Sequence, residues 1–115
     1  MNNKSSESIK LCDDSFSYKQ NILKLFRNNT LNHELAKFFL SWEILQSGGN
    51  FISEAIFKNG KRADILNLEL CEAWEVVHSE RENSKHIKVN EYPCKILFFD
   101  SDKINDFWLK KLTKR

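Results

Sequence analysis

Hydrophobic residues between positions 31 and 46 recur alternately four and three positions apart, and this spacing predicts a helix with one buried face. The face consists of Leu31, Leu35, Phe38, Trp42 and Leu45. Gly48-Gly49 then ends the helix. Leu40 and Ile44 lie on the opposite side, so a second apolar face must pack on a neighbouring helix or on a partner.

Two further stretches favour helices. Residues 16–26 contain enough apolar positions for a short helix, which Asn28-Asn29-Thr30 ends. Near the C-terminus, Ser101 or Asp102 is expected to cap a last helix. Its apolar face consists of Ile104, Phe107, Trp108 and Leu112.

Strand signals lie between these helices. Asn59-Gly60 separates two strand-like runs and predicts a β-hairpin over residues 50–68. A third strand is expected over residues 72–77, and the polar residues 78–91 are long enough for a helix that Pro93 ends. Residues 94–99 form a continuous apolar run, which is typical of a buried central strand.

The order of these elements predicts an α/β fold of mixed α+β type. A helix precedes a three-stranded antiparallel meander, a crossover helix, a further strand and a C-terminal helix, which gives a mixed sheet with helices on its faces. Residues 1–14 are polar and lack periodicity, so we expect a flexible N-terminus there and a single domain over residues 15–115.

Composition limits the function classes. With 41% hydrophobic and 30% charged residues the chain is typical of globular proteins, and its formal charge of +2 requires any nucleic-acid partner to be held by a local basic patch. Cys12, Cys71 and Cys94 are odd in number and widely spaced, which favours buried thiols over disulfides or a zinc site. No apolar run approaches the roughly 20 residues of a membrane helix. We expect a cytoplasmic protein.

Two acids stand out on the predicted strands. Asp64 and Glu75 lie within the short apolar segments 62–66 and 73–77. Asp is disfavoured inside strands, and a pair of carboxylates on adjacent strands can hold a divalent metal ion for phosphodiester chemistry. The alternative is that each acid is a solvated residue on the polar face of its strand.

The element order and several short motifs together resemble the PD-(D/E)XK nuclease superfamily, which has the restriction-endonuclease-like core. The likeness is to small members such as Holliday-junction resolvases and competence-protein-type nucleases, and it spans about residues 31–100. The matching positions are His33, Lys37, Glu54, Gly60-Lys61-Arg62-Ala63-Asp64, Glu75-Val76 and Ser79.

The resemblance implies a metal-dependent DNA endonuclease in which Asp64, Glu75 and the Val76 carbonyl bind Mg²⁺ or Mn²⁺. The lysine that the family has two residues after the glutamate is here Val77. Two readings follow. Lys85 or Lys88 can supply the missing charge from the next helix, or the site has lost activity and the fold serves as a nucleic-acid-binding or protein-interaction module.

Two glutamates are further candidates. A three-residue hairpin loop places Glu54 opposite Asp64 and favours a catalytic role, whereas a two-residue loop points it to the other face. Glu54 can equally pair with Arg62 or Lys61 across the hairpin. Glu34 lies at the edge of the apolar helical face and can reach the sheet as a metal ligand, or it is a first-turn acid favoured by the helix dipole.

Basic residues provide the expected contacts with nucleic acid. His33 and Lys37 lie one turn apart and share a helical face, and Lys58, Lys61 and Arg62 lie at the hairpin tip. The alternative is that all five are ordinary solvated residues on the surface. The expected partner is duplex or branched DNA, with RNA left open. The second apolar face and the small size of the chain favour a homodimer.

Overall fold

The computed structural model of the chain describes residues 3–14, 19–78 and 91–114. The elements within these ranges are α1 (Asn3–Lys10), α2 (Leu31–Gln46), β1 (Phe51–Ile56), β2 (Arg62–Asn67), β3 (Glu72–Val77), β4 (Lys95–Asp100) and α4 (Ser101–Thr113). No helix within these ranges is both long and apolar enough to cross a membrane.

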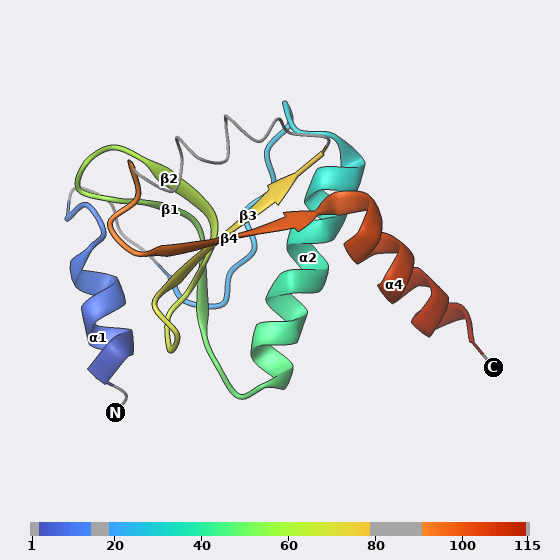
Figure 1. Ribbon diagram of the computed structural model, residues 1–115, viewed down its shortest axis with the longest axis horizontal. Helices are drawn as coiled ribbons and strands as arrows, with labels where there is room; N and C mark the ends of the chain where they lie inside the picture. The colour runs from blue at the N-terminus through green and yellow to red at the C-terminus, as the bar shows by residue number, and fades with distance from the viewer. Residues whose placement is uncertain (1–2, 15–18, 79–90, 115) are drawn as a thin grey trace.

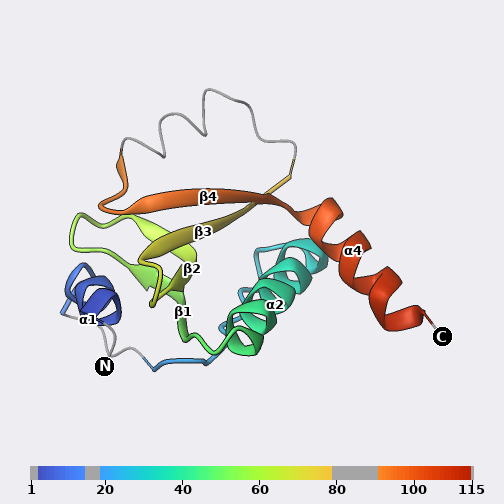
Figure 2. The ribbon, with the colours of Figure 1, turned by 60° about the horizontal axis from the view of Figure 1, so that its bottom comes forward.

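The four strands form one mixed sheet in the order β1-β2-β3-β4. The pairs β1–β2 and β2–β3 are antiparallel, and β4 runs parallel to β3. Helix α1 lies on one side of the sheet, and α2 and α4 lie on the other (Figures 1 and 2). The mixed α/β class is therefore confirmed, as is the antiparallel meander. The parallel pairing requires a crossover, but the helix expected there falls on residues 79–90, outside the described residues.

The β1–β2 hairpin has a three-residue loop. The Phe57 amide donates to the Lys61 carbonyl at 2.8 Å, and Gly60 closes the turn with a φ of 86°. Glycine adopts this left-handed backbone without steric cost. Ala55 pairs with Ala63 and Ser53 pairs with Ile65, so Glu54 lies opposite Asp64, as the three-residue alternative requires.

The hairpin is irregular at these two opposed acids. Glu54 has a φ of 53°, a conformation that residues other than glycine rarely adopt. Ile52 and Ala55 of β1 pack in the same apolar cluster on the α1 side, as do Ala63 and Leu66 of β2. In both strands, the alternation of side chains between the two faces of the sheet is therefore shifted by one residue at this point. The residues on either side of Glu54 and Asp64 keep the same pairing register. The slip directs the Glu54 and Asp64 side chains toward α2.

Apolar residues cover both sides of the sheet. The cluster on the α1 side contains Cys12, Ile52, Ala55, Phe57, Ala63, Leu66, Leu68, Ala73 and Ile96. Two smaller clusters on the α2 side contain Ala36, Leu40 and Val76, and Ile44, Phe51 and Ile65. Helix α1 is held in place by the buried Ser8 hydroxyl, which donates to the Leu68 carbonyl at 2.8 Å.

The predicted orientation of α2 is wrong. Leu40 and Ile44 are fully buried against the sheet, whereas Leu31, Phe38 and Trp42 are exposed. Both faces of this helix are apolar, so the spacing of its hydrophobic residues indicates a helix without indicating which face meets the sheet. The buried face also includes the polar residues Glu34, Lys37 and Ser41.

Other element predictions need correction. Residues 3–14 contain α1 and the buried Cys12, so the expected polar terminus without secondary structure is wrong there. Residues 19–26 form no helix, although a helix was predicted over residues 16–26. Among the described strands β4 lies at the edge of the sheet and is not central. Helix α4 starts at Ser101, because Asp100 is its N-cap in place of the expected Ser101 or Asp102.

Candidate active site

The backbone pairing between β2 and β3 stops where the two acids face each other. The paired residues run from Asn67↔Glu72 to Ile65↔Trp74, and the same register places Asp64 opposite Glu75. There the Asp64 amide donates to Glu75 Oε2 at 2.7 Å, and the Val76 amide donates to Asp64 Oδ2 at 2.8 Å. Each carboxylate thus accepts a backbone hydrogen bond from the opposite strand, and the two acids lie together in a break in the sheet.

The Val76 backbone completes this arrangement. The amide and carbonyl of one residue point toward the same neighbouring strand in an antiparallel pair, so the Val76 carbonyl is directed toward β2, as its amide is. Glu75 is buried and the Asp64 side chain is 18% exposed. Hard oxygen atoms from three groups, two carboxylates and one carbonyl, therefore lie around the break.

Tyr92 is a site residue that the sequence did not reveal. Its hydroxyl lies 2.7 Å from Glu75 Oε1 and also contacts the Arg62 carbonyl. Burial, followed by the charge of Glu75, raises the pKa of Tyr92, so its hydroxyl stays protonated and can donate. Tyr92 follows the segment 79–90, and no motif or spacing connects it with the acids on β2 and β3.

His33 links the first turn of α2 to Asp64. Its Nε2 lies 3.5 Å from Asp64 Oδ2 and its Nδ1 lies 3.0 Å from Glu34 Oε1. The interaction with Asp64 raises the pKa of His33, burial opposes this rise, and the contact with Glu34 adds to it. Thr30 caps the helix by accepting a hydrogen bond from the His33 amide, which fixes the position of this turn.

A buried ion-pair network lies beside the break. Lys37 Nζ is 2.8 Å from Glu54 Oε2 and 3.2 Å from Glu34 Oε2, and it donates to the Lys24 carbonyl at 2.7 Å. Burial raises the pKa of Glu54, and the Lys37 ammonium opposes this rise. Because the Lys37 side chain is fully buried, it cannot contact a phosphate on the surface, and we remove it from the expected nucleic-acid contacts.

Glu34 anchors the segment before α2. Its carboxylate accepts hydrogen bonds from the Phe26 amide at 2.8 Å and from Asn29 Nδ2 at 2.9 Å. Burial acts to raise the pKa of Glu34, but the hydrogen bonds from His33, Phe26 and Asn29 outweigh it and lower that pKa to about 2. Since these groups and Lys37 already engage both oxygens, we leave Glu34 out of the proposed metal ligands.

Arg62 joins this network to the surface. Its Nη1 lies 3.9 Å from Glu54 Oε1, its guanidinium lies over the Phe26 ring, and its side chain is half exposed. Lys58 and Lys61 lie apart, at the exposed hairpin tip, where Lys61 pairs with Glu91 at 2.8 Å. The predicted catalytic Lys85 lies outside the described residues, as does Ser79.

The oxygen donors fit a hard divalent cation. Mg²⁺ and Mn²⁺ prefer carboxylate and carbonyl oxygens and retain bound waters. Among the residues that the structure describes, no three His, Cys, Asp or Glu side chains converge on one point. The fit therefore rests on two carboxylates and the Val76 carbonyl. Val77, at the position where the resemblance implies a lysine, is buried on β3.

Comparison with known proteins identifies no relative. No protein-family model, no curated protein and no solved structure matches the chain.

Proposed function

We propose that this protein is a metal-dependent DNA endonuclease with a restriction-endonuclease-like core. The observation that carries the proposal is the break between β2 and β3, where Asp64 and Glu75 replace the backbone pairing and bring their carboxylates beside the Val76 backbone. An uninterrupted sheet would satisfy its amides with carbonyls. Two acids in this place give the sheet a cluster of oxygen ligands at its surface.

Each group around the break has a part in the proposed reaction. Asp64, Glu75 and the Val76 carbonyl would hold Mg²⁺ or Mn²⁺, which supplies an activated water and offsets charge on the phosphate. The Val76 amide and His33 orient Asp64, and the Asp64 amide and Tyr92 orient Glu75. Arg62 is half exposed and lies 3.9 Å from Glu54, and it is suited to bind a phosphate group of the substrate.

A second candidate is a nuclease-like fold that binds without cutting. Two observations favour it. The acids already serve as acceptors for backbone amides, which is a structural role in itself. Val77 also leaves the end of β3 without the ammonium group that the resemblance implies. In this case the chain is a nucleic-acid-binding or protein-interaction module.

Conservative variants separate these functions. We would incubate wild type, Asp64→Asn and Glu75→Gln with linear duplex, single-stranded and four-way-junction DNA and with RNA, each in Mg²⁺, Mn²⁺ or EDTA. Both amides retain an oxygen that accepts the backbone hydrogen bond, so the break keeps its structure while its charge is lost. Asp106→Asn, an exposed acid on α4, is the matched control.

The expected result is metal-dependent cleavage by wild type and Asp106→Asn, with a loss of at least ~100-fold in Asp64→Asn and Glu75→Gln. Cleavage that survives in Glu75→Gln would contradict the proposed ligand set. Binding of DNA without cleavage under every condition would establish the second candidate instead.

A further inference from the structure

The outer face of α2 carries several large apolar side chains that are exposed. Six large side chains, each between 37% and 82% exposed, lie on it and on the two segments that flank it. They are Leu25, Leu31, Phe38, Trp42, Leu45 and Leu112. We refer to these six residues as the outer apolar face. It includes most of the α2 positions that the spacing of hydrophobic residues predicted to be buried.

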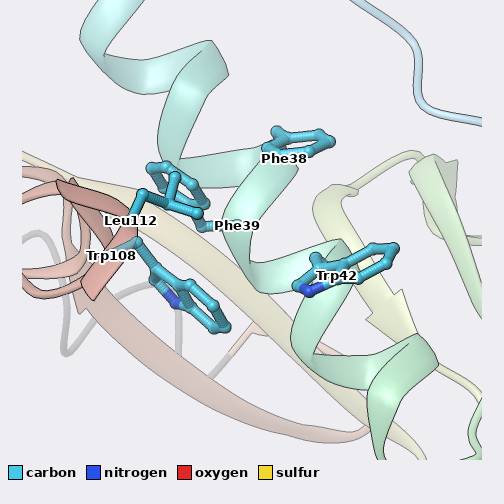
Figure 3. A pocket seen from close by; sticks show the side chains of 5 residues that line it. All are labelled: Phe38, Phe39, Trp42, Trp108 and Leu112. Carbon is cyan, nitrogen blue, oxygen red and sulfur yellow. The ribbon is translucent and has the colours of Figure 1, made fainter. Parts of the chain in front are cut away.

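Three hollows connect these residues into one surface. The first has a volume of about 300 Å³ and lies between α2 and α4, lined by Phe38, Phe39, Trp42, Trp108 and Leu112 (Figure 3). The other two, of about 250 Å³ each, lie between α2 and residues 21–25. Phe38 lines all three hollows, so the outer apolar face is continuous on both sides of this ring.

Stacked aromatic rings form part of the wall of the first hollow. The Phe39 and Trp108 rings are stacked with centroids 5.6 Å apart and planes 9° apart, and they join α2 to α4. Figure 3 shows Phe38 and Trp42 one turn apart on the outside of α2, with Trp108 and Leu112 across from them. A ridge of two aromatic rings thus stands beside concave apolar surface.

From this surface we propose that the outer apolar face is the contact between two copies of this chain. An aromatic side chain presents about 150–250 Å² when fully exposed, so the six partly exposed residues offer on the order of 600 Å² of apolar surface. A subunit of a stable dimer buries about 800 Å², of which roughly 65% is apolar in homodimers. The outer apolar face has the area that such an interface needs, and it lies at the upper end of the roughly 300–600 Å² that the largest apolar patch of a typical monomer covers.

Shape and charge fit a second copy. A two-fold interface places the same surface opposite itself, and this surface contains both the ridge of Phe38 and Trp42 and the hollows that can receive it. The formal charge of the chain is only +2, so repulsion between two copies is weak. The interface makes no use of the break between β2 and β3, and the inference stands without the proposed function.

Sedimentation velocity on the full chain, without DNA or metal, tests the inference. Wild type would be compared with Phe38→Glu and Trp42→Glu over about 1 to 100 μM. Leu70→Glu is the matched control, because Leu70 is 51% exposed in the turn after β2, away from the outer apolar face. Circular dichroism would establish that each variant is folded, and Leu112→Glu on α4 replaces any α2 variant that is not.

We expect a wild-type dimer at micromolar concentration, a dissociation constant at least about 30-fold higher in Phe38→Glu and Trp42→Glu, and no change in Leu70→Glu. A wild type that stays monomeric at the highest concentration would overturn the inference, because the face would then belong to another partner. A dimer that tolerates both α2 substitutions would also overturn it.

Discussion

At the scale of single residues, Glu34 is the acid whose charge contributes most clearly to stability. Its pKa is about 2 in the folded protein, against an ordinary value of 4.5. Because the folded value is the lower one, the ionised carboxylate stabilises the fold above pH 4.5, and this contribution is lost as the pH falls from 4.5 toward 2. The shift corresponds to roughly 3 kcal/mol.

The Glu34→Gln variant tests this contribution. We expect its free energy of unfolding, measured in urea, to be lower than that of wild type by about 2–3 kcal/mol at pH 7. The difference should narrow below pH 4.5, where the wild-type carboxylate becomes neutral. Glu43→Gln is the control, because burial raises the pKa of Glu43 and its ionised form gives no such stabilisation. An equal loss at pH 3 and pH 7 would contradict the assignment.

Tyr92 makes a second prediction at this scale. Tyr92→Phe removes the hydroxyl that contacts Glu75 Oε1, and it leaves the ring packed against Phe57. If this hydroxyl positions a metal ligand, the affinity for Mn²⁺ should fall about 10-fold, with a loss of about 1 kcal/mol in stability. Isothermal titration with Mn²⁺ measures the affinity. Glu72→Gln, at the other end of β3, should leave it unchanged, and an unaltered affinity in Tyr92→Phe would make the contact purely structural.

At the scale of elements, the slip in β1 and β2 places Glu54 in a backbone conformation that costs of order 1–3 kcal/mol for a residue other than glycine. Glycine normally destabilises a strand relative to alanine. At position 54 we expect the reverse, with Glu54→Gly more stable than Glu54→Ala by about 1 kcal/mol in urea denaturation. Both variants lack the ion pair with Lys37, so their difference isolates the backbone. A more stable Glu54→Ala would show that the strand relaxes without strain.

The same elements show how far the sequence predicts the structure. The β-hairpin, the third strand and the span of α2 follow from local signals, namely Asn59-Gly60 and the periodicity of apolar residues. The length of the hairpin loop, two or three residues, stays open in the sequence and is decided by the structure. Short-range spacing also selects Asp64 and Glu75, which the structure brings together. The orientation of α2 depends on the sheet that covers Leu40 and Ile44, and that information is not local.

Other site features are equally non-local. Lys37 is buried because Glu34, Glu54 and the Lys24 carbonyl surround it, and these groups come from three segments of the chain. From the sequence alone, such a lysine is predicted to lie on the surface, since lysine is rarely buried without partners. Tyr92 reaches Glu75 only through the fold. Helix α1 is anchored by one serine hydroxyl and by Cys12, which a polar sequence conceals.

At the scale of the whole molecule, α2 separates two surfaces of different chemistry. Its inner face provides the charged residues beside the break in the sheet, and its outer face provides Phe38 and Trp42. The first turn of α2 and the hairpin carry His33 and Arg62 toward the acids. The proposed nucleic-acid site at the break and the proposed contact with a second copy on the outer apolar face therefore lie on different surfaces of one helix.

Under the proposed function, the near-neutral charge of the molecule means that DNA must be held by a local basic patch, and the hairpin tip is the patch that we propose. Lys58 is exposed there, and Lys61 must leave Glu91 before it can contact a phosphate. Each phosphate contact adds about 0.9 to the slope of log affinity against log salt concentration. Lys58→Ala should therefore reduce the slope by about 0.9, and Lys61→Ala by less.

Fluorescence anisotropy with a labelled duplex in Ca²⁺, over a range of salt concentrations, measures this slope. Lys110→Ala and Lys114→Ala, two exposed lysines at the end of α4, are the controls, and we expect them to bind as wild type does. The hairpin tip and the end of α4 lie at different ends of the molecule (Figure 1). A slope that changes only in the α4 variants would place DNA at the end of α4, away from Asp64 and Glu75, and would contradict an active site at the break in the sheet.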